Sequence, residues 1–265
     1  MAITIKSERE IELMAEAGKI LERVHNELEK ALRPGMSTKD IDTLGEEIIR
    51  SYGCIPSFLN YNGYPASICV SVNQEVVHGI PDKHRIIQEG DIVSLDAGVI
   101  YKGYHSDAAR THAVGEVSEE AKKLIQVTKE SFFEGIKFAK AGNHLFDISG
   151  AIGRYAEERG YGVVRDLCGH GIGTALHEAP EIPNYEVGRK GVRLRPGMTL
   201  AIEPMINIGT HEVDWLDDDW TVVTRDGSLS AHYENTILIT EGEPRILSLT
   251  CENEQNYISK GQQIW

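Results

Sequence analysis

An internal repeat with a constant offset of 107 residues constrains the fold of this chain more than any other feature. Four residues recur at this offset: Gly35, Asp40, Ile41 and Gly53 return as Gly142, Asp147, Ile148 and Gly160. The stretch EGDIVSLD (89–96) likewise returns as PGMTLAIE (196–203), which places Glu203 where Asp96 stands. A repeat this long is not a solenoid period. The sequence therefore predicts an α/β (α+β) fold of two halves about a pseudo-twofold axis, with a common curved sheet and helices outside.

Local signals predict the elements of the first half. Ser7 and Glu10, spaced as a capping box, precede a run of apolar residues with a helical period. Ser37 and Asp40 have the same spacing. The predicted elements are helices at 7–32 and 37–51 and strands at 67–73 and 91–100. We expect a single domain over residues 1–250, with halves of about 1–115 and 116–250, followed by a peripheral tail over 251–265.

Composition and charge narrow the class of protein. Hydrophobic residues make up 41% and charged residues 26%, as in a soluble protein with a well-formed core. No apolar run approaches the roughly 18–20 residues of a membrane span, so we expect no membrane partner. The net charge of −14 argues against nucleic acid and mildly favours cationic partners such as metal ions or free amino termini. Four widely spaced cysteines and a start without a signal peptide's apolar core predict a cytoplasmic protein.

Residues 91–112 have the pattern of a β-hairpin. Two strand-like runs flank Tyr101-Lys102-Gly103-Tyr104, with glycine at the turn. With a two-residue loop, Asp96 and Asp107 fall on one face of the hairpin, directly opposite or one diagonal apart, roughly 5–8 Å. That separation suits two carboxylates sharing a pair of cations about 3.5–4 Å apart. Two solvated aspartates are the alternative, which the apolar neighbours of Asp96 weaken, because an unpaired buried carboxylate is costly.

A glycine-rich stretch at residues 168–180 surrounds His170. Its three glycines are Gly169, Gly171 and Gly173. We expect them to remove side chains around His170 and let ligands approach the backbone closely. A dinucleotide loop is excluded, because Leu176 stands where G-x-G-x-x-G requires its third glycine. His177 adds a second imidazole for acid–base chemistry or hydrogen bonding, and an incidental histidine in a flexible turn is the alternative.

Three further polar residues stand at strand ends or turns. Glu203 ends an apolar run and precedes Pro204, Glu234 precedes an apolar strand, and His78 precedes a Gly-Ile-Pro turn. Each has a surface alternative, but the repeat favours Glu203 as a site residue because it matches Asp96. Four carboxylates and one imidazole form a set suited to two divalent cations. This candidate set is Asp96, Asp107, His170, Glu203 and Glu234.

Several motifs over about residues 3–249 resemble those of type I methionine aminopeptidases. They are NYNGYPASICVSVN (60–73), VVHGIP (76–81), DAGVIYKGYHSDAART (96–111), GHGIG (169–173), IEPM (202–205) and SLSAHYENT (228–236). The resemblance implies the pita-bread fold, in which a curved antiparallel sheet is covered by helices. It also implies hydrolysis of the initiator methionine from the N-termini of nascent polypeptides whose second residue is small.

Carried over by position, the resemblance implies a centre with two divalent metal ions. Asp96 would bind one ion, Asp107 and Glu234 would bridge both, and His170 and Glu203 would complete the second. An oxygen-rich shell without thiolates favours Mn, Fe or Co over zinc, although sequence does not exclude Zn. A monovalent cation is a further implication of the resemblance, on backbone oxygens near Asn73, Glu75 and Ser230.

The resemblance also implies catalytic and pocket roles. Glu203 resembles the general base, His177 the group that hydrogen-bonds the substrate carbonyl oxygen, and His78 the residue near the scissile nitrogen. The methionine side chain would lie among Phe58, Tyr61, Tyr64, Cys69, Leu176 and Trp220. Phe58 and Leu176 depart from the family, which often has a cysteine and an aromatic residue there, so the outline of the pocket is open. His232 stands where glutamine is common.

Two alternatives stay open. A proline-directed relative, such as aminopeptidase P or prolidase, usually has an added N-terminal domain, for which residues 1–41 leave no space. An inactive pita-bread protein that serves as a binding module should have lost metal ligands, and all five are present. We expect a monomer that makes transient contact with the ribosome.

Overall fold

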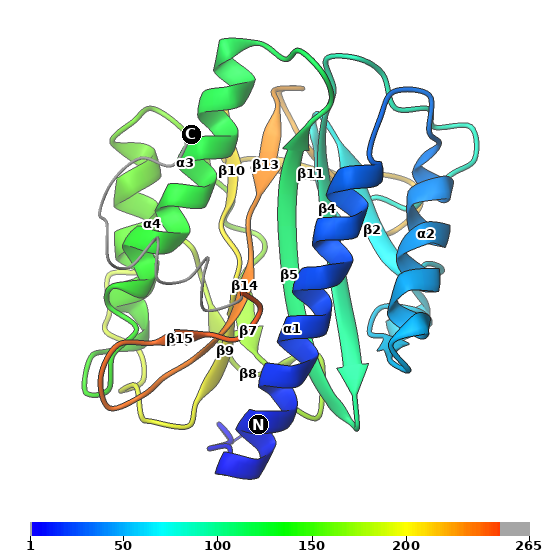
Figure 1. Ribbon diagram of the computed structural model, residues 1–265. Helices are drawn as coiled ribbons and strands as arrows, with labels where there is room; N and C mark the ends of the chain where they lie inside the picture. Colours follow the sequence, from blue (N-terminus) through cyan, green and yellow to red (C-terminus); the bar gives the residue numbers. More distant parts are fainter. Residues whose placement is uncertain (1, 250–265) are drawn as a thin grey trace.

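The computed structural model of this protein describes residues 2–249. In it, helices lie on the outer side of a curved array of strands (Figure 1). The helices are α1 (Glu8–Ala31), α2 (Thr38–Ser51), α3 (Glu119–Ile136) and α4 (Leu145–Glu157), with a 3₁₀ turn at Tyr61–Gly63. The predicted tail, residues 251–265, lies outside the described residues. Within residues 2–249, no helix is both long enough and apolar enough to cross a membrane.

The strands form four hydrogen-bonded groups within the described residues, and the pairings are antiparallel. The first half contributes β1 (Ile55–Pro56), β2 (Ile68–Val72), β3 (Glu75–Val77), β4 (Ile92–Tyr101) and β5 (Tyr104–Ala113). The second half contributes β6 (Gly162–Val163), β7 (Gly169–Gly171), β8 (Glu178–Ile182), β9 (Thr199–Ile202), β10 (Met205–Asn207), β11 (Val213–Trp215), β12 (Val222–Thr224), β13 (Ser230–His232), β14 (Asn235–Leu238) and β15 (Arg245–Ile246). β4 pairs with β1, β2 and β5; β9 pairs with β7 and β14, which extend to β8 and β15. β10 joins β6 to β13, and β12 joins β3 to β11.

Capping boxes begin both helices of the first half, as predicted. The Ser7 N–H donates to Glu10 Oε2 at 2.7 Å, and Ser7 Oγ accepts from the Glu10 N–H at 3.4 Å. Ser37 and Asp40 make the same two bonds at the start of α2. Each box satisfies two of the N–H groups that a helix start leaves without an intrahelical partner.

The repeat is confirmed in the backbone. The Gly35 N–H donates to Ile87 O at 2.9 Å, and at the equivalent place the Gly142 N–H donates to Leu194 O at 3.0 Å. Both glycines are left-handed, with φ of 90° and 92°, a conformation that glycine adopts without strain. The same turn therefore leads into α2 in the first half and into α4 in the second.

The two halves meet where β5 lies beside Glu234, between β13 and β14. The Ala109 N–H donates to Glu234 O at 3.4 Å, and the Glu234 N–H donates to Ala109 O at 3.0 Å. Two threonine hydroxyls flank this point symmetrically: Thr236 bonds both backbone groups of Asp107, and Thr111 those of His232. The pseudo-twofold axis passes through this pair of strands, so side chains from both halves face one another across it.

Each half has its own hydrophobic core between helices and strands. Residues of α1, α2, β2 and β4, such as Leu21 and Val70, form one buried cluster. Residues of α3, α4, β9 and β14, such as Phe132 and Ile237, form another. Burial of these two clusters holds the strands rigidly on either side of the axis.

Candidate active site

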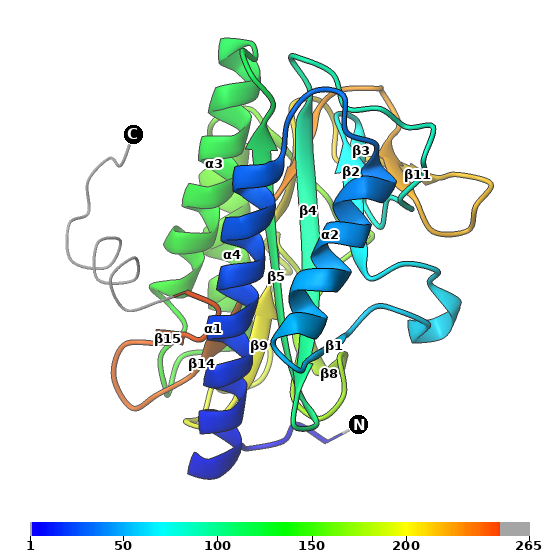
Figure 2. The same cartoon turned by 45° about the vertical axis from the view of Figure 1, so that its right-hand side comes forward.

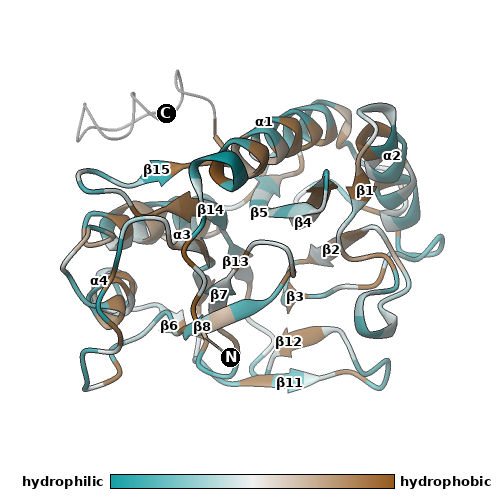
Figure 3. Ribbon diagram, turned by 90° about the horizontal axis from the view of Figure 1, so that it is seen from below, coloured by the Kyte–Doolittle hydropathy of each residue, from teal (hydrophilic) through white to brown (hydrophobic). Residues whose placement is uncertain are grey.

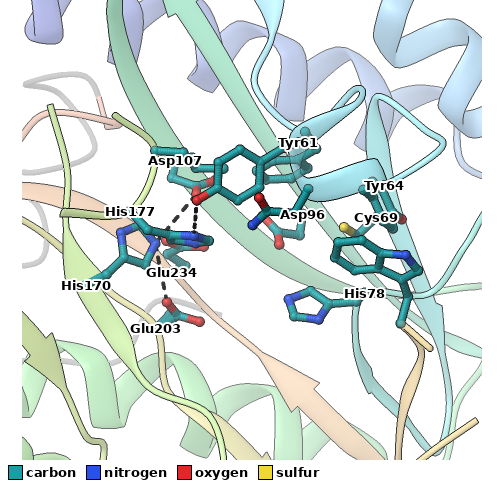
Figure 4. A pocket seen from close by; sticks show the side chains of 14 residues that line it. Tyr61, Tyr64, Cys69, His78, Asp96, Asp107, His170, His177, Glu203 and Glu234 are labelled. Atoms are coloured by element: carbon teal, nitrogen blue, oxygen red, sulfur yellow. Dashed lines mark hydrogen bonds and ion pairs between the residues drawn. The ribbon is translucent and has the colours of Figure 1, made fainter. Parts of the chain in front are cut away.

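One cavity, of about 130 Å³, is lined by every residue predicted for the metal centre, for catalysis and for the methionine pocket. Its lining is Phe58, Tyr61, Asn62, Tyr64, Cys69, His78, Asp96, Asp107, His170, Leu176, His177, Glu203, Trp220 and Glu234. Asp107, His170, Glu203 and Glu234 gather at one end, with Tyr64 and Cys69 at the other (Figure 4). The 3₁₀ turn with Tyr61 and the loop from β11 to β12 project on the same side of the molecule (Figure 2). The cavity therefore joins a carboxylate-rich end to an aromatic and apolar end.

The β4–β5 hairpin sets the first two carboxylates. Asp96 pairs with Ala109 and Asp107 pairs with Gly98, so the two aspartates share a face one diagonal apart, as predicted. Lys102 and Gly103 form the two-residue loop with φ of 49° and 85°, which a type I′ turn requires. The turn thus fixes the register that places both side chains in the cavity.

His170 lies in the middle of β7, beside β9. Its Nδ1 is 2.9 Å from Gly171 O, and because a carbonyl only accepts, Nδ1 donates the proton. The lone pair of the neutral ring is then on Nε2, which lies 3.7 Å from Glu203 Oε1 and 3.9 Å from Asp107 Oδ2. The backbone bond therefore fixes the tautomer and leaves an unprotonated Nε2 beside two carboxylates, an arrangement that could hold a metal ion.

The glycines around His170 make room for neighbouring strands and for the Lys6 side chain, so the expectation that they let a ligand approach was wrong. A Cβ on Gly169 would lie 2.4 Å from Ala201 O of β9, and one on Gly171 would lie 2.1 Å from Ala179 O of β8. A Cβ on Gly173 would lie 2.4 Å from Cε of Lys6. The glycine pattern lets β7 fit closely between its neighbours while His170 faces the cavity.

The four carboxylates are held where their charges oppose one another. Burial raises the pKa of Asp96 to about 7. Burial, with the negative charges of neighbouring carboxylates, raises the pKa of Asp107, Glu203 and Glu234 well above their usual range. Among the described residues, Asp96 Oδ1, Asp107 Oδ1 and Glu234 Oε1 are buried without a hydrogen-bond partner. Buried anionic oxygens without a protein donor are suited to a cation.

Two of the carboxylates and His170 have ligand atoms close enough together to hold one ion. Atoms of Asp107, His170 and Glu234 lie within 4.8 Å of one another, and all three residues are buried. Asp96 and Glu203 line the same cavity. The donor set, carboxylate oxygens and one imidazole without thiolates, fits divalent cations.

Three other histidines border this centre. The His177 Nδ1 is 2.8 Å from the Tyr61 hydroxyl, and its ring lies 4.2 Å from that of His170. Burial, with the charge of His177, lowers the pKa of His78 to about 4, so this imidazole is neutral near pH 7. His232 is buried with neither ring nitrogen bonded to a described residue, and its Nε2 lies 3.9 Å from Glu203 Oε2.

Asn62 is a lining residue that the sequence analysis missed. Its backbone is left-handed, with φ of 49°, and it stands within Asn60-Tyr61-Asn62-Gly63. Two asparagines beside a glycine are a signal for left-handed turn residues, and this signal could have placed Asn62 at the tip of the turn.

The Metallopeptidase family M24 model matches residues 12–241. The chain belongs to metallopeptidase family M24. Methionine aminopeptidase of Clostridium acetobutylicum is 58% identical over 250 residues, which are 94% of this chain and 100% of the relative. Methionine aminopeptidase 1 of Bacillus subtilis is 52% identical, over 90% of this chain and 96% of the relative.

Solved structures of M24 peptidases share the fold. Methionine aminopeptidase from Thermotoga maritima matches with a TM-score of 0.92 and 47% identity, over 94% of this chain and 100% of that one. An Xaa-Pro dipeptidase from Bacillus anthracis matches with a TM-score of 0.74 and 28% identity, and the match covers 62% of its length. The M24 fold, the predicted pita-bread arrangement, is thus common to both specificities, while identity and length place this chain nearer the methionine aminopeptidases.

Proposed function

We propose that this M24 metallopeptidase is a methionine aminopeptidase that hydrolyses the N-terminal methionine from peptides whose second residue is small. The observation that supports this most strongly is the union of two unlike surfaces in one cavity. The carboxylates and His170 form one end. The other end is continuous with a hydrophobic cluster that includes Phe58, Tyr64, Cys69 and Leu176. An unbranched thioether side chain suits such an apolar and aromatic surface.

Two divalent cations would be held by Asp96, Asp107, His170, Glu203 and Glu234. Four carboxylates give a charge of −4, which two divalent ions would neutralise. When bound, such ions supply Lewis-acid polarisation of the scissile carbonyl and a nucleophile at neutral pH. The oxygen-rich donors favour Mn, Fe or Co, with zinc a weaker match.

The protein's own residues would then move and position protons. Glu203 is within reach of two imidazoles, with one oxygen 3.7 Å from His170 Nε2 and the other 3.9 Å from His232 Nε2, and we assign it the role of general base. The Tyr61 hydroxyl, by donating to His177 Nδ1, would keep the proton of that ring on Nε2. His177 can then donate from Nε2 to the carbonyl oxygen as it gains negative charge. We place neutral His78 near the scissile nitrogen.

The natural substrates we propose are N-termini of nascent polypeptides in the cytoplasm. Four features stay predictions: a monomeric state, contact with the ribosome, the monovalent-cation site and a single domain over residues 1–250. We also assign Tyr61 and Trp220 to the pocket for the methionine side chain, because both line the cavity with Phe58, Tyr64, Cys69 and Leu176.

Cleavage of Met-Ala-Ser with Mn²⁺ or Co²⁺, followed by chelation, tests this function. We expect methionine release that stops on chelation and returns when metal is restored, because the ligands without metal cannot activate water. Gly-Pro serves as the competing substrate. Cleavage of Gly-Pro but not of Met-Ala-Ser would favour a proline-directed enzyme, and cleavage of neither with bound metal would favour the inactive binding module.

Metal binding should weaken as the pH falls through neutrality. Because the folded-state pKa of Asp96 is about 7 and those of its neighbours are also raised, the metal-free folded protein holds protons that the unfolded chain releases above about pH 4. Metal-free stability should therefore fall as pH rises through 7, and cations must displace these protons. His170, with a pKa of about 3, stays neutral throughout.

The measurement is the shift in melting temperature on adding saturating Mn²⁺, at about pH 8 and about pH 6. We expect the larger shift at the higher pH, where the carboxylates have lost their protons. An equal or larger shift at the lower pH would contradict cation binding by these carboxylates.

A further inference from the structure

The loop between β7 and β8 presents two site residues, Leu176 and His177. Leu176 is buried in the cavity wall, whereas His177 is exposed. β8 begins with Glu178 directly after His177, so the position of Glu178 limits where the imidazole can lie. The contacts of this loop therefore bear on substrate placement.

A buried ion pair ties this loop to the N-terminal arm, residues 4–6. Lys6 Nζ lies 2.6 Å from Glu178 Oε2, and their side chains are 4% and 12% exposed. The Thr4 hydroxyl donates to the same oxygen at 2.7 Å. The other oxygen, Oε1, accepts from the Ala175 N–H at 3.3 Å. Glu178 is thus bonded both to the arm and to the backbone of its own loop.

The arm also lies against the loop backbone and bonds the segment that leads into β9. A Cβ on Gly173 would lie 2.4 Å from Lys6 Cε, so the lysine stem lies directly against the loop backbone. The Lys6 N–H donates to Gly197 O at 2.8 Å, two residues before β9, the strand that Glu203 follows. In the view from below, the N-terminal arm lies beside β8 (Figure 3).

We propose that Lys6 and Glu178 are positioning residues that hold the loop 173–178 so that His177 meets the substrate carbonyl and Leu176 meets the methionine side chain. This inference rests on the proposed aminopeptidase function. Lys6 is not among the residues that line the cavity, so it acts through the loop. Removing one partner leaves the other charge buried and unpaired, which would release the loop. Small displacements of positioning groups reduce turnover strongly.

Lys6→Met tests the proposal, with Lys6→Arg as the conservative variant and Lys19→Met as the control. Lys19 forms an exposed pair with Glu16 on α1. For Met-Ala-Ser we expect kcat to fall about 10- to 100-fold in Lys6→Met, recovery in Lys6→Arg, and a change within about twofold in Lys19→Met. Mn²⁺ affinity should stay near that of the unaltered protein, and amide hydrogen exchange over 173–178 should accelerate.

If Lys6→Met folds poorly, the double variant Lys6→Met/Glu178→Gln tests the same proposal, because it removes both charges and leaves no unpaired buried charge. We expect this double variant to regain thermal stability but not kcat. Lys6→Met that loses stability while keeping kcat and slow exchange would overturn the proposal, as would a double variant with full kcat. If the unaltered protein does not cleave Met-Ala-Ser, the proposed function fails, and hydrogen exchange still decides whether the pair orders the loop.

Discussion

Asp107→Asn is expected to abolish turnover and to lower metal affinity by at least about 100-fold. Loss of a residue that only supports a metal ligand lowers affinity by up to about 100-fold, and loss of a ligand should cost at least as much. Asp107 lies on β5 at the axis, with one oxygen 3.9 Å from His170 Nε2 and the other without a hydrogen-bond partner among the described residues. An amide provides one neutral oxygen where the carboxylate provides two anionic ones, so it would hold divalent cations much more weakly. Calorimetric titration with Mn²⁺ and methionine release from Met-Ala-Ser measure the two effects.

Asp217→Asn, on an exposed loop residue, is the matched control and should leave both quantities unchanged. Misfolding is separable from loss of metal, because removing one of four mutually repelling carboxylates should not lower the melting temperature of the metal-free protein near pH 8. Full activity in Asp107→Asn would remove this residue from the metal centre.

His177→Ala is expected to lower kcat about 10²- to 10³-fold while metal affinity is retained. This range is typical for the loss of one hydrogen-bond donor to a developing oxyanion. His177 belongs to the loop before β8 and touches His170 only through ring contact at 4.2 Å between centroids, so the metal ligands should stay in place. Single-turnover rates on Met-Ala-Ser and Mn²⁺ titration are the measurements.

Tyr61→Phe provides the companion variant for His177. Phenylalanine keeps the ring but removes the hydroxyl that lies 2.8 Å from His177 Nδ1, so the imidazole tautomer is no longer fixed. We expect a smaller fall in kcat than in His177→Ala. If His177→Ala loses metal binding in parallel with kcat, the residue supports the metal centre and is not a carbonyl donor.

Local chemistry made much of this fold predictable. The capping boxes depend on side chains three residues apart, and the register of the β4–β5 hairpin depends on its two-residue turn and on the alternation of side chains. The repeat related Asp96 to Glu203, and both side chains line the cavity. In these cases the determining residues are close in sequence or are copies of each other.

Duplication alone does not generate the other ligands. The symmetric bonds of Thr111 and Thr236 show that Asp107 corresponds to His232, and that Glu234 corresponds to Ala109. The repeat therefore predicts the place of these residues but not their chemistry. The two halves have diverged at the axis, where identical copies would have given a symmetric set of side chains.

Contacts between distant segments were not predictable from sequence patterns. Lys6 meets Glu178 and Tyr61 meets His177 across 172 and 116 residues, and neither pair has a local signature. The glycines around His170 were misinterpreted for the same reason. A glycine admits a ligand or a neighbouring strand equally well, and only the positions of β8 and β9 decide between them.

A crystal structure of the Mn²⁺-loaded protein, with anomalous scattering data, tests the central claim most directly. We expect two strong anomalous peaks about 3.5–4 Å apart, enclosed by Asp96, Asp107, His170, Glu203 and Glu234. Asp107 and Glu234 should lie between the two peaks. No peak among these five side chains, or a single ion bound by other residues, would contradict a two-metal centre at the axis.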